Sequence, residues 1–305
     1  MKKILLLIIF SATIHQTLAC SVCGCSASNQ YLGILPQSKN NFAGIQYQYR
    51  VFNSKHSSVI TEGTPNISKD YYHTTQVWGR YNISDRVQFF AFVPYVFNER
   101  VENNIYSKNN GLGDISILVN YSLLSTKKTS AKLIHNLLLG GGIKLPTGKY
   151  DIDAIRLGDG MPNMQSGTAS FDFIANINYT IQQKRNGLNT ELSYTLTTAN
   201  KYDYKFGNRL GAGITMFRTM RLRDNNIIPQ VGIRYEISSL DYSNYYWSAK
   251  NRESGGHVLY GAAGMQFFYR SIGGQVRLSV PVSQNYAGGK INSKYKVETG
   301  LYFLF

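Results

Sequence analysis

Three cysteines near the N-terminus are the residues best suited to chemistry, in the order Cys20-Ser-Val-Cys23-Gly-Cys25. Thiolates bind soft ions such as Cu(I) and Zn(II), so a metal site on this short segment is one of three alternatives. Cleavage before Cys20 would instead allow lipidation, although Thr17 stands where lipoprotein processing usually has leucine. Pairing of the thiols with each other or with another chain is a third alternative. A c-type haem is excluded because Gly24 follows Cys23, where attachment requires histidine.

Other residues of chemically useful types do not form a catalytic pattern. Residues 142–150 resemble a phosphate-binding loop, but Tyr150 stands where serine or threonine must bind magnesium. His135 beside Asn136 is the histidine most suggestive of a hydrolase dyad, yet the strand pattern described below turns it toward lipid. The acidic loop 151–159 fits no known calcium-loop spacing. We therefore expect no enzyme activity and no cofactor beyond a metal ion at the cysteines.

The first nineteen residues have the features of an export signal. Lys2 and Lys3 precede a short apolar run, and small residues lead to a cleavage site after Ala19. The run is much shorter than the ~20 residues that a membrane-spanning helix requires. We predict a signal peptide at 1–19, a periplasmic cysteine-containing segment at 20–40 and one folded domain at 41–305. Residues from about 26 to 40 are candidates for a plug of that domain.

From residue 41 onward, apolar and polar residues alternate with a period of two. This period places the two sets on opposite faces of β-strands that are long enough to cross a bilayer. No long apolar helix is apparent, and a content of 43% hydrophobic residues is too high for a disordered chain. The predicted strands are 42–52, 71–83, 86–98, 112–124, 131–145, 169–181, 189–199, 206–220, 226–238, 256–270, 272–284 and 293–305.

The links between these strands alternate in length. Short turns such as 84–85 and 271 alternate along the chain with long links such as 146–168 and 239–255. Bacterial outer-membrane barrels have short periplasmic turns and longer outer loops. The sequence therefore predicts an all-β protein, an antiparallel transmembrane β-barrel of about twelve strands in the outer membrane of a Gram-negative bacterium. An even number of strands places both termini on the periplasmic side.

The C-terminus and the aromatic residues agree with this prediction. The last predicted strand alternates and stops on Phe305, which resembles the signal read by the outer-membrane assembly machinery. The chain has 23 tyrosines and 15 phenylalanines, and barrels use such residues in girdles at the two membrane interfaces. The expected partners are outer-membrane lipids and the assembly machinery. Nucleic acid is not expected despite a net charge of +15, because the chain is exported and has no contiguous basic patch.

The polar phase of the strands should face the barrel lumen, and its charged residues are slightly more often basic than acidic. Such a lumen has two interpretations: a water-filled path that favours small anions, or a structural network of ion pairs that fills a narrow barrel. The predicted lumen-facing residues are Arg50, Arg80, Asp114, Lys144, Asp172, Glu191, Arg209, Arg234, Glu236, Arg277, Lys296 and Glu298.

Two glycine-containing stretches resemble a known barrel family. They are Gly-Leu-Gly-Asp-Ile-Ser-Ile at 111–117 and Gly-Gly-Gly-Ile-Lys-Leu-Pro-Thr-Gly at 140–148. The family comprises outer-membrane transporters named for the phenol meta-cleavage pathway, and the cysteine segment is similar to a subgroup associated with exported metal handling. The resemblance implies passive passage of a small solute and assigns no catalytic residue. The alternatives are a copper- or zinc-handling accessory that uses the cysteines, and a structural or adhesive barrel that uses loops 53–70 and 146–168.

Overall fold

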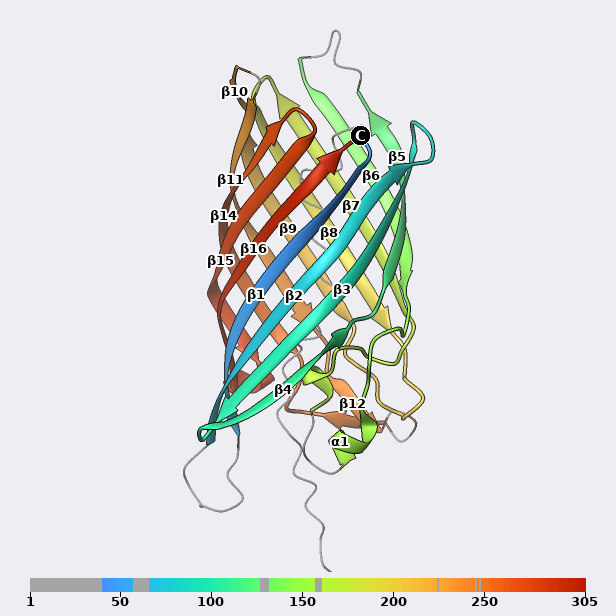
Figure 1. Ribbon diagram of the computed structural model, residues 1–305, viewed down its shortest axis with the longest axis vertical. Coiled ribbons are helices and arrows are strands. Elements are labelled where there is room, and N and C mark those ends of the chain that lie inside the picture. Colours follow the sequence, from blue (N-terminus) through green and yellow to red (C-terminus); the bar gives the residue numbers. More distant parts are fainter. Residues whose placement is uncertain are drawn as a thin grey trace, which may run out of the picture.

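The computed structural model describes residues 40–56, 66–126, 132–156, 161–223, 225–244, 246 and 248–305, which form a closed antiparallel barrel with steeply tilted strands (Figure 1). Twelve strands of this described part make the wall, so the predicted fold class is confirmed. They are β1 (Phe42–His56), β2 (Asn66–Asn82), β3 (Val87–Glu102), β5 (Ser116–Ser125), β6 (Ile134–Lys144), β7 (Asp172–Gln183), β8 (Asn186–Thr197), β9 (Arg209–Arg218), β11 (Asn225–Ser238), β14 (Gly256–Tyr269), β15 (Ile272–Tyr286) and β16 (Ile291–Leu304).

The barrel closes where the last strand pairs with the first. β16 and β1 are antiparallel, from Phe42 opposite Leu304 to Ser54 opposite Ile291. The Phe305 amide also donates to the Asn41 carbonyl at 3.0 Å, which extends the seam to the last residue. Closure removes the bare strand edge that a bilayer would leave without hydrogen-bond partners.

The two ends of the barrel differ in the elements that they carry. The end with β10 (Met220–Leu222), the C-terminus and short connections is named the turn end (Figure 1). The opposite end, named the loop end, carries β4, β12, β13, η3 and the short helices of the β6–β7 loop. None of the described helices is long and apolar enough to cross a membrane. These elements are β4 (Ile105–Leu112), α1 (Ile152–Arg156), η2 (Pro162–Met164), β12 (Asp241–Asn244), β13 (Ala249–Asn251) and η3 (Ala287–Gly289).

The link between the strands predicted at 86–98 and 112–124 contains regular structure. β3 runs on to Glu102, and β4 pairs back along it. Asn103 and Asn104 connect the two with φ values of 50° and 64°. Two successive left-handed residues are the geometry of the tight hairpin turn that matches strand twist, and asparagine tolerates it well. β3 and β4 therefore extend the wall as a two-stranded ribbon at the loop end.

Apolar and polar side chains divide between the two faces of the wall. In β3, the exposed Val93, Tyr95 and Phe97 alternate with inward residues that are buried. Inside, long side chains lie over glycines: a Cβ at Gly273 would come within 1.9 Å of the Tyr302 ring. This alternation of large and small residues lets side chains pack closely across neighbouring strands inside a barrel of few strands.

The interior has two large apolar clusters with polar residues between them, and a smaller one of Phe217 and Ile228. Along β1, Phe42 belongs to the turn-end cluster and Phe52 to the loop-end cluster, and Gln46, Gln48 and Arg50 lie between them. The turn-end cluster is Phe42, Trp78, Phe90, Phe92, Leu118, Ile174, Tyr302 and Leu304. The loop-end cluster is Phe52, Tyr72, Met164, Val258, Tyr260, Tyr286, Ala287 and Ile291.

Candidate functional site: the barrel interior

A group of charged residues occupies the interior between the two apolar clusters. Arg234 of β11 forms ion pairs with Glu191 of β8 and with Glu236, whose Oε1 lies 2.8 Å from Arg234 Nε. Glu191 is opposite Gly213 of β9, and Gly213 is opposite Arg234. A Cβ at Gly213 would lie 3.0 Å from Glu191 Oε1. Because glycine leaves the middle strand bare, two side chains from strands that are not neighbours can meet over it.

The same group continues across β15, β16 and β1. Lys296 Nζ lies 3.3 Å from Glu298 Oε1, and Gln48 Nε2 donates to the same oxygen at 2.9 Å. The register places Arg277 opposite Glu298 and Arg50 opposite Lys296. All of these side chains except Gln48 are buried. Buried charges are costly unless they are paired, so removal of one partner should destabilise the barrel strongly.

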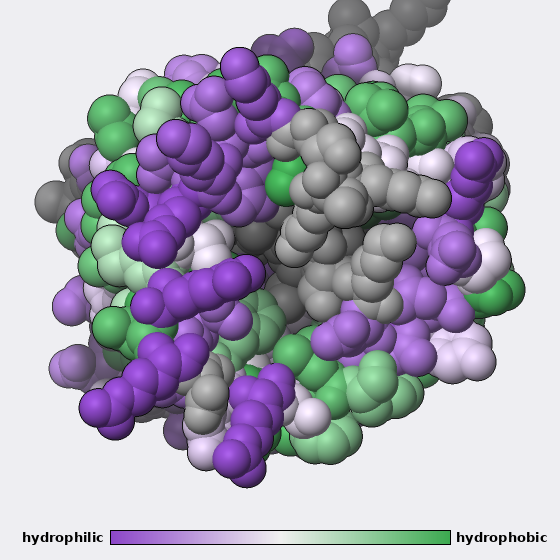
Figure 2. Space-filling model, turned by 90° about the horizontal axis from the view of Figure 1, so that it is seen from above, coloured by the Kyte–Doolittle hydropathy of each residue, from purple (hydrophilic) through white to green (hydrophobic). Residues whose placement is uncertain are grey.

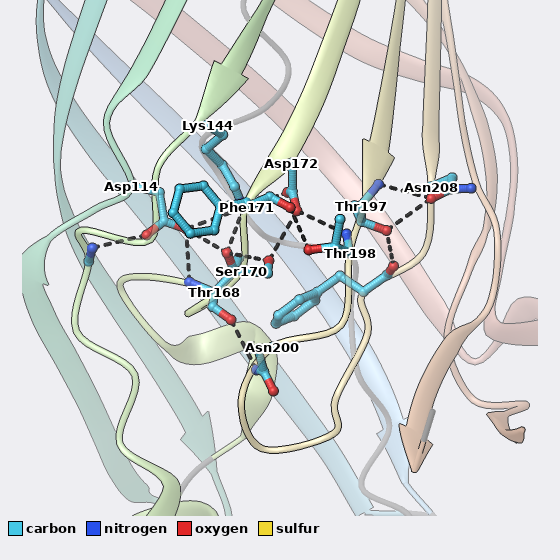
Figure 3. A network of polar contacts seen from close by, with 12 residues as sticks. Asp114, Lys144, Thr168, Ser170, Phe171, Asp172, Thr197, Thr198, Asn200 and Asn208 are labelled. Atoms are coloured by element: carbon cyan, nitrogen blue, oxygen red, sulfur yellow. Dashed lines mark hydrogen bonds and ion pairs between the residues drawn. The ribbon is translucent and has the colours of Figure 1, made fainter. Parts of the chain in front are cut away.

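A second polar cluster anchors the long β6–β7 loop to the wall at the loop end (Figure 3). Lys144 Nζ lies 2.6 Å from Asp172 Oδ2 and 3.2 Å from Asp114 Oδ2, and it donates to Thr168 Oγ1 at 2.6 Å. Asp114 also accepts from the backbone amides of Thr168 and Gly148, each at 2.9 Å. One lysine and two carboxylates therefore hold both ends of the loop. We call these residues the loop anchor.

The middle of this loop folds into the barrel. Asn163, Met164, Gln165 and Ser166 are all buried, and the Asn98 side chain donates to the Met164 carbonyl at 2.9 Å. The described loop therefore narrows the interior from the loop end. Of the predicted plug at 26–40, the structure describes only Asn40. The insertion of the β6–β7 loop into the barrel was not predicted from the sequence.

One buried ion pair next to the inserted loop was absent from the predicted lumen set. Arg100 Nε lies 2.5 Å from Asp70 Oδ1, and Arg100 also contacts the Met161 sulfur. Both charged residues fell into predicted links, at 53–70 and 99–111. The alternation of β2 and β3 continues into these segments, and this continued period of two was the signal that could have identified them.

The predicted lumen residues occupy several different environments in the structure. Ten of them are buried, whereas Glu191 and Arg209 are partly exposed. Arg80 lies apart at the turn end, where it donates to the Asn40 carbonyl and its guanidinium is 5.2 Å from the Phe42 ring centre. The ten buried residues are Arg50, Arg80, Asp114, Lys144, Asp172, Arg234, Glu236, Arg277, Lys296 and Glu298.

The remaining candidates are not part of the interior. Cys20, Cys23 and Cys25 lie outside the described residues, and within the described ranges no three histidine, cysteine or acidic side chains are grouped to hold a metal. Phe305 is exposed on the outer wall. His135 Nδ1 lies 2.8 Å from the Tyr179 hydroxyl, a contact that fits an interfacial structural residue.

The family model described as "Putative MetA-pathway of phenol degradation" matches residues 50–290. The chain belongs to this family. The match covers both stretches, at 111–117 and 140–148, that carried the resemblance in the sequence. The cysteine segment lies before the matched residues, so its proposed subgroup stays a prediction. No curated protein sequence matches the chain.

Solved structures similar to this family member include one described as an outer membrane channel. The COG4313 outer membrane channel from Pseudomonas putida F1 matches with a TM-score of 0.65 and 9% identity, over 87% of this chain and 95% of that chain. A FadL homologue from Pseudomonas aeruginosa gives 0.42 at 9% identity, over 87% and 90%. The AIDA-I transport unit from Escherichia coli gives 0.46 at 7% identity, over 90% and 93%. At such low identity, the first likeness shows a shared fold.

Proposed function

We propose that the protein is an outer-membrane channel through which a small solute diffuses passively, without chemistry. The observation that carries the proposal is a closed twelve-strand barrel with an apolar outer wall and a charged interior. An apolar wall suits lipid, and a polar interior suits water and solutes. The similar structure from Pseudomonas putida is described as an outer membrane channel, which supports the same conclusion.

The turn end corresponds to the periplasmic side in this proposal. Short connections characterise the periplasmic end of bacterial barrels, and both Asn41 and Phe305 lie at the turn end. The cysteine segment would then extend into the periplasm. The terminal Phe305, exposed at the end of β16, is available for recognition by the assembly machinery before the barrel closes.

The interior charges suggest a preference for anions. The predicted lumen residues and the pair Asp70–Arg100 together contain more cations than anions. Rings of basic side chains favour anionic solutes in a narrow path. The inserted loop limits the size of such solutes, because it narrows the interior at the loop end.

The test is single-channel conductance of the purified full chain in planar bilayers. We expect discrete conductance steps and a reversal potential shifted toward the anion equilibrium in a salt gradient. Protein that inserts as a folded, heat-modifiable barrel but never conducts would contradict the channel while leaving the fold intact. Cation-selective steps would contradict only the anion preference.

Metal capture by Cys20, Cys23 and Cys25 is a separate proposal that rests on the spacing of three thiols. Its test is Cu(I) and Zn(II) affinity of the full chain in detergent. A Cys23→Ser/Cys25→Ser double variant should bind metal much more weakly, since soft ions need thiolate ligands. Unchanged affinity in the double variant would end the proposal.

A further inference from the structure

The outer wall near the turn end has a cavity that the channel proposal does not use. Its volume is about 680 Å³, and it lies between β7, β8, β9 and β11, with the segment before β6 at its side. Such a volume falls within the ~300–1,000 Å³ typical of small-molecule sites. Outward-facing apolar side chains contribute much of the lining, among them Leu133, Leu188, Met216 and Val231.

A local break in strand pairing lies beside this cavity. β9 and β11 pair as far as Phe217 opposite Gln230, and pairing resumes only where Met220 of β10 faces Ile227. Between these points lies Pro229, which has no backbone N–H to donate to a neighbouring strand. The wall is therefore less tightly closed here than elsewhere along β11.

The mouth of the cavity is strongly basic. Arg218 lines the cavity, and the Thr219 amide donates to the Arg185 carbonyl at 2.7 Å, which brings the β7–β8 turn beside it. Lys184 of the β7–β8 turn and Arg221 of β10 are also exposed. Among the described residues of 132–133, 183–188, 216–223 and 225–231 there is no acidic side chain. Figure 2 views this end of the barrel and shows hydrophilic side chains gathered around its rim.

The two faces of β11 meet different surroundings beside the cavity. Gln230 is buried and lies on the same phase as Arg234 and Glu236, which face the interior, whereas Val231 is exposed on the outward phase. The cavity is therefore bordered on the outside mainly by apolar side chains, with Arg218 at its edge.

We propose that this cavity binds an anionic phospholipid. Arg218 and the cations around it bind the phosphate, since guanidinium groups form paired hydrogen bonds with phosphate oxygens. The acyl chains lie along the outward apolar lining. The proposal rests on the membrane placement given above, but it does not depend on conduction through the lumen.

The test measures lipid retention by native mass spectrometry. The full chain is equilibrated in mixed micelles that contain phosphatidylglycerol, phosphatidylcholine and palmitate in equal amounts. We expect selective retention of one phosphatidylglycerol per barrel. An Arg218→Gln/Arg221→Gln variant should retain about tenfold less, because it loses charge-assisted contacts to the phosphate. A Met216→Trp variant, which fills the cavity from the wall, should lose retention with the charges intact.

The matched control removes a charge from the same rim at a distance from the cavity. Arg86 lies in the turn between β2 and β3, several strands from the cavity in either direction around the barrel. An Arg86→Gln variant should retain phosphatidylglycerol like the unmodified chain, whereas Arg218→Gln alone should retain less. Heat-modifiable migration establishes that each variant is folded. Equal retention of phosphatidylglycerol and phosphatidylcholine would overturn the proposal. Equal losses in Arg218→Gln and Arg86→Gln would show general attraction to the rim and would overturn it as well. Selective retention of palmitate would reassign the cavity to a fatty acid.

Discussion

Both ends of the barrel interior have an apolar cluster, but the loop end also holds an inserted loop through buried ion pairs. At the loop end, charged residues such as Lys144 and Asp114 fasten a loop that folds into the barrel. At the turn end, aromatic rings pack on one another, with Phe42 against Trp78 at 4.6 Å and Trp78 against Phe92 at 5.8 Å. An irregular loop has backbone groups that need partners, whereas paired strands need only apolar packing inside. This difference predicts that polar changes at the loop end alter both stability and conductance, and apolar changes at the turn end alter stability alone.

The largest expected effect is at the loop anchor. Lys144→Met leaves Asp114 and Asp172 buried without their cation, and breaking a buried pair in this way costs about 3–5 kcal/mol. The β6–β7 loop should leave the interior, so single-channel conductance should rise. Lys149→Met is the control, because Lys149 is on the same loop and its pair with Asp151 is largely exposed. Equal conductance in both variants would mean that the inserted loop does not limit the path.

The turn end should respond to loss of packing. Leu118→Ala removes a fully buried side chain from the aromatic cluster and should lower the free energy of unfolding by about 3 kcal/mol. Conductance per channel should stay the same, because no anchor is broken. Urea titration in lipid vesicles measures the stability change. Leu123→Ala, on the outward face of the same strand, is the matched control and should change stability much less. A changed ion selectivity in Leu118→Ala would show that the two ends are coupled.

A smaller effect is expected where glycine separates paired charges. Gly213→Ala places a Cβ about 3.0 Å from Glu191 Oε1 and forces the carboxylate away from Arg234. Such crowding should cost about 1–2 kcal/mol and shift the reversal potential as the ion pair loosens. Gly261→Ala, whose added Cβ would meet only Val282 at 3.4 Å, should be close to neutral. Equal stability and equal reversal potentials in the two variants would mean that Glu191 can move without weakening its ion pair with Arg234.

The sequence predicted the wall better than the loop end. A period of two identified all twelve wall strands, because one face meets lipid and the other meets the interior throughout. The inserted loop could not be predicted in this way, since Met164 enters the barrel through contacts with Asn98 and Arg100 that depend on the register of distant strands. The alternation predicted that Asp114, Lys144 and Asp172 face the lumen. It could not predict that they come together around Thr168, because this depends on how the loop folds. The cavity beside Pro229 depends likewise on where the pairing between β9 and β11 stops.

The smallest expected effect concerns the exposed part of the same loop. The Ala154 backbone amide donates to Asp151 at 3.1 Å, and this hydrogen bond, with Lys149 nearby, holds the pKa of Asp151 below its usual 3.8. A lowered carboxyl pKa means that the contribution to stability is complete above pH 4 and is lost as the pH falls through the folded value. We expect α1 to fray in acid while Lys144 keeps the anchor in place. Amide hydrogen exchange at Ala154 should therefore lose protection relative to the intrinsic rate as the pH falls below 4, and Asp151→Asn should remove that change. An Asp153→Asn control should keep it, and acid-induced exchange across the whole loop would mean that the anchor, too, depends on this exposed carboxylate.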